Sequence, residues 1–282
     1  MKIPFAKMHG IGNDYIYVDC LAHTLENPEQ LARLWSDRHK GIGSDGLVLI
    51  LPSATCDFRM RMFNADGSEA EMCGNAARCI GKYVYDFGLT DKARLTLETK
   101  AGVRTLTLFV ENGRVERVTV DMGEPILEAA RIPVDLPQQR IVDTQVFIAD
   151  DVYDITCVSM GNPHTVIFSA DISNLDLARR GAAIEYSELF PQRTNVEFVQ
   201  VIDQSHLRMR VWERGAGETM ACGTGACAAV VAAVQNRKTG REVAVSLLGG
   251  DLQVAWHDDN HVYLTGTATL VFEGEIEIFS EK

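Results

Sequence analysis

Long hydrophobic runs are absent from this 282-residue sequence. No segment approaches the roughly 18 consecutive apolar residues that a membrane-spanning helix needs. The first residues, "MKIPFAKMHGIGND", also lack an apolar stretch followed by a cleavage site, which would mark a secretory signal. We therefore expect a cytoplasmic protein that does not bind membranes.

Basic residues are scarce relative to acidic ones. The chain has 27 Lys and Arg against 39 Asp and Glu, which gives a formal net charge of -12. Such a surface repels phosphate backbones, so we expect no nucleic-acid partner. With 46% apolar and 23% charged residues, the composition is that of an ordinary globular protein and excludes a disordered chain.

Cysteines are too few, at seven, and odd in number, which excludes a disulfide framework and agrees with a reducing compartment. Cys222 and Cys227 are separated by four residues, but no second close Cys or His pair accompanies them, so no zinc site is expected. There is no P-loop, and "GIGSDG" does not fit a dinucleotide-binding turn. We expect neither a metal nor a cofactor.

What the sequence does contain is an internal repeat. When residues 58–77, "FRMRMFNADGSEAEMCGNAA", are placed on residues 207–226, "LRMRVWERGAGETMACGTGA", seven positions are identical. The shift is 222 minus 73, or 149 residues, and it also places Gly12-Asn13 on Gly161-Asn162. The chain therefore contains two copies of one unit, and Cys73 and Cys222 are the same position in each.

Each copy contains a sheet and one main helix. "FRMRMF" and "LRMRVW" alternate polar and apolar residues, which predicts half-buried strands. "NAARCIGKYVYDF" and "TGACAAVVAAVQN" predict helices, and the second is small or apolar on nearly every face, as expected of an enclosed helix. Further strands are predicted at "LVLIL", "RLTLET", "VRTLTLFV", "RVERVTV", "VAVSLL", "LQVAW", "VYLTG" and "EIEIF". The fold class is α+β, with a curled antiparallel sheet or barrel around a central helix in each copy.

We expect two pseudo-symmetric domains. The N-terminal domain is residues 1–121 with 267–282 and carries Cys73, and the C-terminal domain is residues 122–266 and carries Cys222. Prolines between residues 121 and 140 interrupt the strand pattern and predict the boundary. The active site is expected in the cleft between the domains.

A cysteine at the start of a helix has a specific chemical meaning. The first amides of a helix are unpaired donors at its positive end, so they hold a carboxylate and stabilise a thiolate. Gly74 and Gly223 would let a ligand approach the backbone closely. Two such sites facing one ligand suit inversion at a carbon beside a carboxylate, where one thiolate removes the α-proton and the opposite thiol returns one.

A single cysteine is more often a buried core residue than a catalyst. Two cysteines in register at glycine-flanked helix starts favour catalysis instead. The remaining five lack that context and are interpreted as structural: Cys20, Cys56, Cys79, Cys157 and Cys227.

With these motifs the sequence resembles the diaminopimelate epimerases, which interconvert LL- and meso-diaminopimelate without a cofactor. The resemblance covers essentially the whole chain through "GNDYIYVD", "DRHKGIGSDG", "FNADGSEAEMCGNAARC", "GNPHTVIF", "RTNVEFV" and "ERGAGETMACGTGACA". It implies a function in lysine and peptidoglycan-precursor biosynthesis, a homodimer, and two barrels each with a central helix, the C-terminal strands returning to the first domain.

The resemblance also implies roles for individual residues. Cys73 and Cys222 are the base and acid, and His164 and Glu213 assist at the reacting centre. Arg214 receives the distal carboxylate, for which a bidentate guanidinium is apt. The remaining substrate-binding residues include the helix starts that hold the reacting carboxylate: Asn13, Asn64, Gly74, Asn75, Asn162, Asn195, Glu213, Gly223 and Thr224.

Two positions depart from the family pattern. Gly46 stands where a substrate-contacting Gln is common, which leaves one contact open, and Ala76 stands where Gly is usual, which concerns helix packing. The repeat itself has lost its symmetry next to the site, because Glu213 and Arg214 fall on Asn64 and Ala65.

Other functions remain open on the sequence. A two-thiol racemase or epimerase acting on proline, hydroxyproline or histidine would share the cysteine pair, and Arg214 with the asparagines is the feature that argues for diaminopimelate. A non-catalytic amino-acid-binding module would not need both thiols. A thiol redox protein is disfavoured because the sequence has no C-x-x-C.

Overall fold

The computed structural model describes residues 2–277 and divides the chain into two compact units. The first contains the residues up to Val120 and those from Gly266 onward, and the second is Asp121–Thr265. Part of the strand predicted at residues 275–279 lies outside the described residues.

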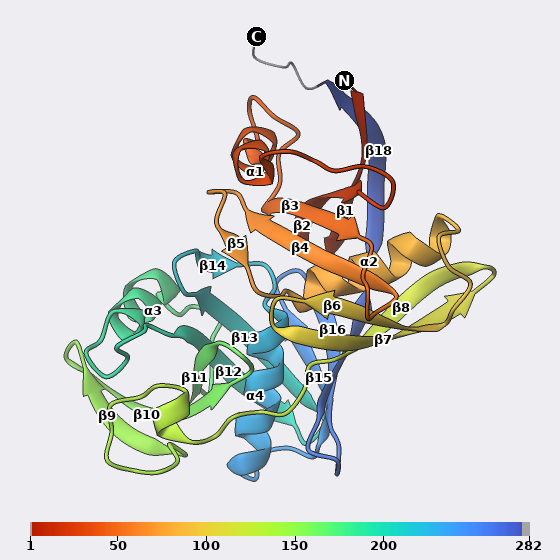
Figure 1. Ribbon diagram of the computed structural model, residues 1–282. Coiled ribbons are helices and arrows are strands. Elements are labelled where there is room, and N and C mark those ends of the chain that lie inside the picture. Colours follow the sequence, from red (N-terminus) through yellow and green to blue (C-terminus); the bar gives the residue numbers. More distant parts are fainter. Residues whose placement is uncertain (1, 278–282) are drawn as a thin grey trace. The chain divides into compact units, whose positions relative to one another are not determined.

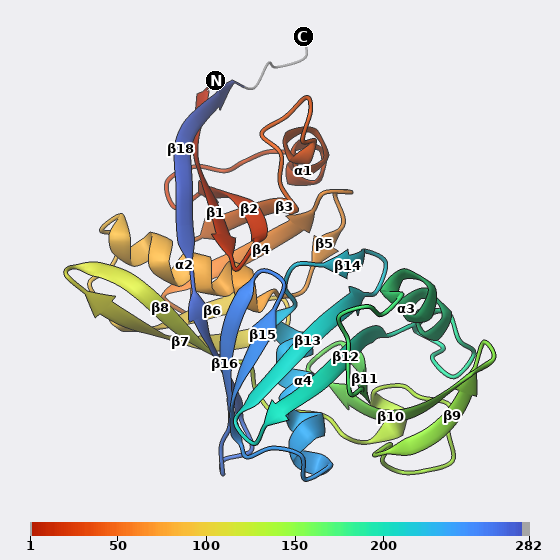
Figure 2. The same ribbon diagram turned by 180° about the vertical axis from the view of Figure 1, so that it is seen from behind.

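The first unit is a curled sheet with a helix against it (Figure 1). Its strands pair in the order β18–β1–β2–β3–β4–β6–β7–β8; β2/β3 and β4/β6 are parallel, the other pairs are antiparallel, and β5 pairs with β4. The C-terminal strand β18 runs beside β1 (Figure 2). The strands are β1 (Lys2–Gly10), β2 (Asn13–Asp19), β3 (Gly46–Leu51), β4 (Phe58–Asn64), β5 (Glu69–Ala70), β6 (Arg94–Thr99), β7 (Gly102–Glu111), β8 (Arg114–Asp121) and β18 (Thr269–Glu277).

Alternation along the strands places the core. In β4, Phe58, Met60 and Met62 are buried, whereas Arg59 is exposed and Arg61 half-buried. Successive side chains of a strand point to opposite faces, so this one strand has a core face and a solvent face. The helix α2 (Gly74–Asp86) packs against β1 and β7, and the short helix α1 (Pro28–Ser36) packs against β3 and β4.

The second unit repeats this arrangement. Its strands pair in the order β9–β10–β11–β12–β13–β15–β16–β17, with β11/β12 and β13/β15 parallel, the others antiparallel, and β14 on β13. The strands are β9 (Thr144–Ile148), β10 (Asp151–Ser159), β11 (Pro163–Phe168), β12 (Asn195–Asp203), β13 (His206–Glu213), β14 (Gly217–Thr219), β15 (Glu242–Leu247), β16 (Gly250–Trp256) and β17 (Val262–Thr267).

The helix α4 (Gly223–Gln235) is the enclosed helix that the sequence predicts. Ten of its 13 residues are buried, all of them Gly, Ala, Val or Cys. It packs against β10, β11, β12, β13 and β16, which curl around it (Figure 1). Small side chains allow strands to approach a helix from several sides, which explains its lack of a polar face.

The predicted fold class is confirmed: the structure is α+β, mostly sheet, with a curled sheet around a helix in each unit. The short helices α1 and α3 (Leu177–Glu185) were not predicted from the sequence. Their start signals are nevertheless present, because Pro28 opens α1 and the Asp176 side chain accepts a hydrogen bond from the Arg179 amide.

Candidate active site

The two predicted cysteines occupy the same structural position in their units. Cys73 is the residue immediately before α2 and Cys222 the residue immediately before α4, and both helices have 13 residues. Both cysteines have extended backbones, with φ and ψ of -138° and 123° at Cys73 and -127° and 111° at Cys222. Each thiol therefore lies where a strand-side turn meets the positive end of a helix.

In the first unit the Cys73 thiol points to Asn13. Its sulfur donates to Asn13 Oδ1 at 3.6 Å, and Asn75 Nδ2 donates to the same oxygen at 3.1 Å. Gly74 and Asn75, the first two residues of α2, are buried. Four predicted site residues thus form one group around the start of α2.

The orientation of Asn13 is fixed by Asp45, a residue that sequence reasoning did not include. Asn13 Nδ2 donates to Asp45 Oδ2 at 2.8 Å, and the Asp14 amide donates to the same oxygen at 3.1 Å. Because a carboxylate accepts hydrogen bonds, the amide nitrogen of Asn13 faces Asp45 and its oxygen faces Cys73. The position of Asp45 inside "GIGSDG", immediately before the buried strand β3, was the available signal.

Charges of both signs surround the contact between Asn13 and Asp45. Asp14 accepts from Lys7 Nζ at 2.6 Å and from Arg38 Nη2 at 2.7 Å, and Arg38 Nη2 also contacts Asp45 Oδ1 at 2.9 Å. Burial opposes ionisation of Asp14, but hydrogen bonds from Arg38 and Lys7 outweigh it and hold the pKa of Asp14 below its ordinary value. Burial, together with the neighbouring Asp14 charge, raises the pKa of Asp45.

Asn64 and Gly46 lie opposite each other on β4 and β3. The Asn64 side chain is exposed and donates to Ser68 Oγ at 3.0 Å; within residues 2–277 the structure does not join it to the Cys73 group by a hydrogen bond. A Cβ atom on Gly46 would lie 2.0 Å from the Phe63 carbonyl oxygen. A larger residue at position 46 would therefore require the backbone to shift from this conformation. The second departure, Ala76, is buried in α2.

In the second unit the Cys222 sulfur has two hydrogen-bond partners at the start of α4. Its sulfur lies 3.5 Å from Thr224 Oγ1 and accepts from the Gly225 amide at 3.4 Å. Asn162 Nδ2 donates to Thr224 Oγ1 at 3.3 Å. Gly223 is the first residue of α4 and is buried, as is Cys222 itself.

His164 lies behind this group, fully buried on β11. Its Nε2 is 3.0 Å from Asn162 Oδ1 and its Nδ1 is 2.7 Å from Glu197 Oε1. Glu197 is also fully buried, and sequence reasoning missed it. The signal was a single acidic residue inside the apolar strand "NVEFV", which is unusual because charged residues are rarely buried without a partner.

Glu213 ends β13 close to Cys222. Its carboxylate accepts a short hydrogen bond from the Thr219 hydroxyl, and burial raises its pKa above the ordinary value. Burial, together with the charges of Glu213 and Glu197, in turn raises the pKa of the Cys222 thiol well above its ordinary value. Glu213 therefore belongs to the electrostatic surroundings of the thiol.

Arg214 lies in the turn after β13. Its amide donates to Asn195 Oδ1 at 2.9 Å, and Asn195 Nδ2 donates to the Pro163 carbonyl at 2.8 Å. The Arg214 side chain is exposed, with Nη1 donating to the Gln192 carbonyl at 3.0 Å. Asn195 thus acts on the position of Arg214 through the backbone.

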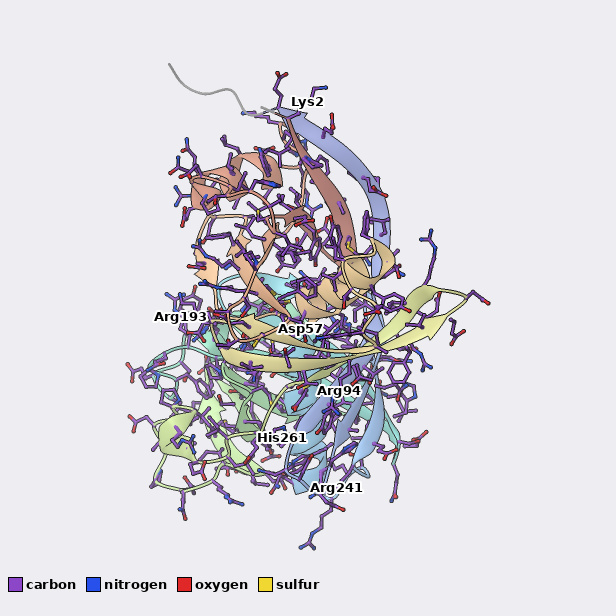
Figure 3. All side chains as sticks on the ribbon, turned by 45° about the vertical axis from the view of Figure 1, so that its right-hand side comes forward. Lys2, Asp57, Arg94, Arg193, Arg241 and His261 are labelled. Carbon is purple, nitrogen blue, oxygen red and sulfur yellow. The ribbon has the colours of Figure 1, made fainter. Side chains whose placement is uncertain are left out.

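A second buried carboxylate, Glu185, holds the same turn and was also missed. It accepts from Gly215 N at 3.0 Å and from Trp212 Nε1 at 2.7 Å. Arg193, labelled in Figure 3, lies 3.7 Å from Glu185 Oε1 with its guanidinium over the Tyr186 ring. The turn that carries Arg214 is therefore tied down on both of its sides.

Burial keeps the thiols of three other cysteines protonated. Burial raises the pKa of Cys20 and Cys79 to about 11 and that of Cys157 to about 12. All seven cysteines are free. Within residues 2–277 no group of three or more His, Cys, Asp and Glu is placed to hold a metal ion, and no helix is long and apolar enough to cross a membrane.

Comparison with known proteins places this arrangement in a family. The sequence model described as diaminopimelate epimerase matches residues 5–128 and 156–271. The chain is 59% identical over 285 residues to the diaminopimelate epimerase of Desulfovibrio desulfuricans, covering 99% of each chain. It is 57% identical over 275 residues to that of Methanococcus maripaludis strain C5, covering 97% of this chain and 99% of the relative.

Among solved structures, a probable proline racemase of Agrobacterium radiobacter superposes with a TM-score of 0.75 at 15% identity, covering 99% of this chain and 93% of that one. A likeness at that identity carries the fold alone. The sequence relatives decide the family, and the resemblance seen in the motifs is confirmed: this chain belongs to the diaminopimelate epimerase family.

Proposed function

We propose that this protein interconverts LL- and meso-2,6-diaminopimelate by two-base proton transfer between Cys73 and Cys222. The observation that carries the proposal is the pair of cysteines at equivalent helix starts, with Cys73 bonded to Asn13 directly and Cys222 linked to Asn162 through Thr224. Relatives of 51–59% identity named diaminopimelate epimerase favour this substrate over proline, hydroxyproline or histidine. A non-catalytic binding module has no use for two thiols in register.

The reaction balances with the two sulfurs alone. One cysteine, as thiolate, takes the α-proton, so a C–H bond breaks and an S–H bond forms. The other, as thiol, gives its proton to the opposite face of the carbanion and becomes thiolate. The substrate leaves with inverted configuration, the two thiols have exchanged protonation states, and no cofactor is needed.

The helix starts would bind the carboxylate beside the reacting carbon. Gly74 and Asn75 begin α2, and Gly223 and Thr224 begin α4, so their backbone amides lie at the positive ends of the two helices, where a carboxylate is bound well. Charge that develops on the carboxylate as the proton leaves is stabilised by the positive ends of both helices. This supplies the electrostatic stabilisation that a metal or pyridoxal phosphate supplies elsewhere.

The other polar side chains have separate roles. Arg214 is exposed on a fixed turn and suits bidentate binding of the distal carboxylate. His164 and Glu213 assist at the reacting centre from within the Cys222 group. The remaining substrate-binding residues are Asn13, Asn64, Asn162 and Asn195.

The active site would form in the cleft between the domains, residues 1–121 with 267–282 and residues 122–266, with one thiol on each side of one carbon. Mild oxidation should then join Cys73 to Cys222 and abolish activity, and a reductant should restore both. Oxidised enzyme that keeps both thiols free and loses no activity would contradict this geometry.

We also propose a homodimer in the cytoplasm. Val271 and Phe272 on β18 are 54% and 45% exposed, one on each face of the strand, and exposed apolar side chains suit a subunit contact. Free thiols persist in a reducing compartment. Light scattering after size-exclusion chromatography would report the mass, and a monomer at micromolar concentration would overturn the dimer.

The test of the function is proton NMR of the reduced protein with LL-diaminopimelate in deuterium oxide. We expect deuterium at the α-position together with formation of the meso isomer. Proline, hydroxyproline and histidine are run separately as comparison substrates. Exchange only in one of these would transfer the two-thiol mechanism to another substrate, and no exchange in any would favour a binding module.

A further inference from the structure

Glu197 is the most unusual buried group in the second unit. Both Glu197 and its partner His164 are 0% exposed, with Glu197 Oε1 2.7 Å from His164 Nδ1. The other oxygen, Glu197 Oε2, has no hydrogen-bond partner among the described residues. A buried carboxylate with an unpaired oxygen destabilises the folded state, so its presence calls for an explanation.

The fold itself does not require this pair. At the shift of 149 residues, His164 falls on Tyr15 and Glu197 on Val48. The strand registers agree, because His164 pairs with Asn195 as Tyr15 pairs with Gly46. Tyr15 and Val48 are both buried. The first unit therefore fills the same positions without an ionisable pair, and the explanation must lie in what the pair does.

The pair begins a chain of hydrogen bonds that ends at sulfur. His164 Nε2 lies against the oxygen of Asn162, which accepts, so Nε2 carries a hydrogen. The Asn162 nitrogen then donates to Thr224 Oγ1. Since Thr224 Oγ1 accepts that bond, its own hydrogen is available for the Cys222 sulfur at 3.5 Å. Each donor in this chain points toward Cys222.

Proton counting defines what Glu197 contributes. With a hydrogen already on Nε2, one further proton lies between His164 Nδ1 and Glu197 Oε1. The pair is then neutral overall, either as imidazole with carboxylic acid or as imidazolium with carboxylate. Without a partner at Nδ1, the imidazole can carry its single hydrogen on that nitrogen, and the chain toward Cys222 loses its direction.

Gly225 shows how closely the Glu197 carboxylate and the Cys222 thiol are packed. A Cβ atom there would lie 2.8 Å from Glu197 Oε1 and 3.2 Å from Cys222 Sγ. The first turn of α4 thus passes directly over both the carboxylate and the sulfur. The Gly225 amide adds a second donor to the sulfur at 3.4 Å.

We propose that Glu197 is a positioning residue for Cys222: it holds His164 so that the chain through Asn162 and Thr224 donates to the sulfur and favours its thiolate form. This deepens the proposed epimerase function and rests on it for its biological meaning. It distinguishes the two thiols, because Asn13 in the first unit turns its oxygen to Cys73 and accepts from that thiol.

A rival account treats Glu197 as a negative charge only. The ionisable groups that face Cys222 are Glu213 from β13 and Glu197 from β12, with His164 of β11 behind them. A bare carboxylate disfavours a nearby thiolate, so its removal would make Cys222 more reactive. The hydrogen-bond chain predicts that removing Glu197 makes Cys222 less reactive.

The experiment measures alkylation of Cys222 by iodoacetamide at pH 7, resolved by mass spectrometry, in the Cys73→Ala background. Glu197→Val introduces the residue that the first unit uses and should lower the Cys222 rate about tenfold, since it removes the ordering of one charge-assisted donor. Glu197→Gln should remain within about threefold of the parent, because an amide can still donate to Nδ1. The charge account predicts that both substitutions raise the rate alike.

A second variant tests the chain at its other end. Thr224→Val should lower the Cys222 rate by a similar factor, and adding Glu197→Val to it should lower the rate no further. Glu242→Gln removes an exposed carboxylate on β15 of the same unit, outside the hydrogen-bond chain, and should leave the Cys222 rate unchanged; Cys56 in the same digest controls for the reagent. A further fall in the double variant, or a rate increase in Glu197→Val, would overturn the proposal.

Turnover separates this proposal from the function. In the enzyme with both cysteines, Glu197→Val should lower kcat about tenfold and leave KM for diaminopimelate unchanged, since Glu197 does not touch substrate. A wild-type enzyme inactive on diaminopimelate would refute the substrate while the alkylation result stood. An active wild-type enzyme with unaltered Cys222 alkylation in Glu197→Val would refute only the positioning role.

Discussion

The two halves of the molecule share one plan but surround their thiols differently. In the first, Asp45 takes the amide nitrogen of Asn13, so the Asn13 oxygen faces Cys73. In the second, His164 donates to the oxygen of Asn162, so the Asn162 nitrogen donates toward Cys222 by way of Thr224. The same asparagine at the same position is thus turned in opposite senses. Duplication supplied two equal sites, and the neighbours of one amide made them unequal.

The largest expected effect comes from removing either thiol. Cys73→Ser or Cys222→Ser should lower the rate of meso-diaminopimelate formation by about 10³ or more, because a hydroxyl is a poor base near neutral pH. The rate is followed by NMR with purified LL-diaminopimelate. If only one half were catalytic, one of the two variants would keep a near-normal rate, and the comparison would lose its basis.

The next test makes the halves alike at Arg214. Arg214→Ala introduces the residue found at position 65 and should lower kcat/KM about 100-fold, or roughly 3 kcal/mol, through loss of the distal carboxylate contact. Arg208→Ala, at an exposed residue of the preceding strand β13, is the control. Equal activity of the Arg214 and Arg208 variants would remove Arg214 from substrate binding.

A third test addresses Gly46, which falls on Asn195 of the second half. Gly46→Asn or Gly46→Gln should destabilise the fold by about 1–3 kcal/mol, because the Cβ atom would meet the Phe63 carbonyl at 2.0 Å. A thermal melt should show a decrease of several degrees. Gly240→Ala is matched, since its Cβ would find its nearest neighbour at 3.6 Å, and should melt like the wild type. An unchanged melting temperature in Gly46→Gln would contradict the steric reading.

The smallest expected effect concerns the pH dependence of folding stability. We assign part of this dependence to Asp14 in the first half. The pKa of Asp14 is held below its ordinary value of 3.8, whereas the equivalent position in the second half is Pro163. A depressed carboxyl pKa stabilises the fold above the unfolded value and ceases to do so as pH falls through the folded value.

Asp14→Asn should therefore be less stable than the wild type in urea at pH 7, and the difference should narrow as the pH is lowered below about 4. Asp258→Asn, at an exposed turn position of the second half, controls for the loss of a surface carboxylate. A difference between Asp14→Asn and wild type that is constant from pH 7 to pH 3 would show that Asp14 acts only through packing.

The sequence could predict the features that follow from the internal repeat and from the alternation of polar and apolar residues. The shift that aligns Cys73 with Cys222 follows from identities in the chain, and so do the curled sheets and both central helices. The carboxylates Asp45, Glu185 and Glu197 could not be identified in the same way. Each acts through contacts with residues 27 to 33 positions away, and no local pattern reports such a contact.

The sequence by itself therefore determined the duplication, the two thiols at helix starts and the family, because these depend on identity and on spacing along the chain. The tertiary structure alone decided which way each asparagine amide is turned, because that depends on whether Asp45 or His164 lies within hydrogen-bonding distance of it. Hydrogen-bond direction is set by the acceptor or donor that packing supplies, and packing joins residues that the chain keeps apart.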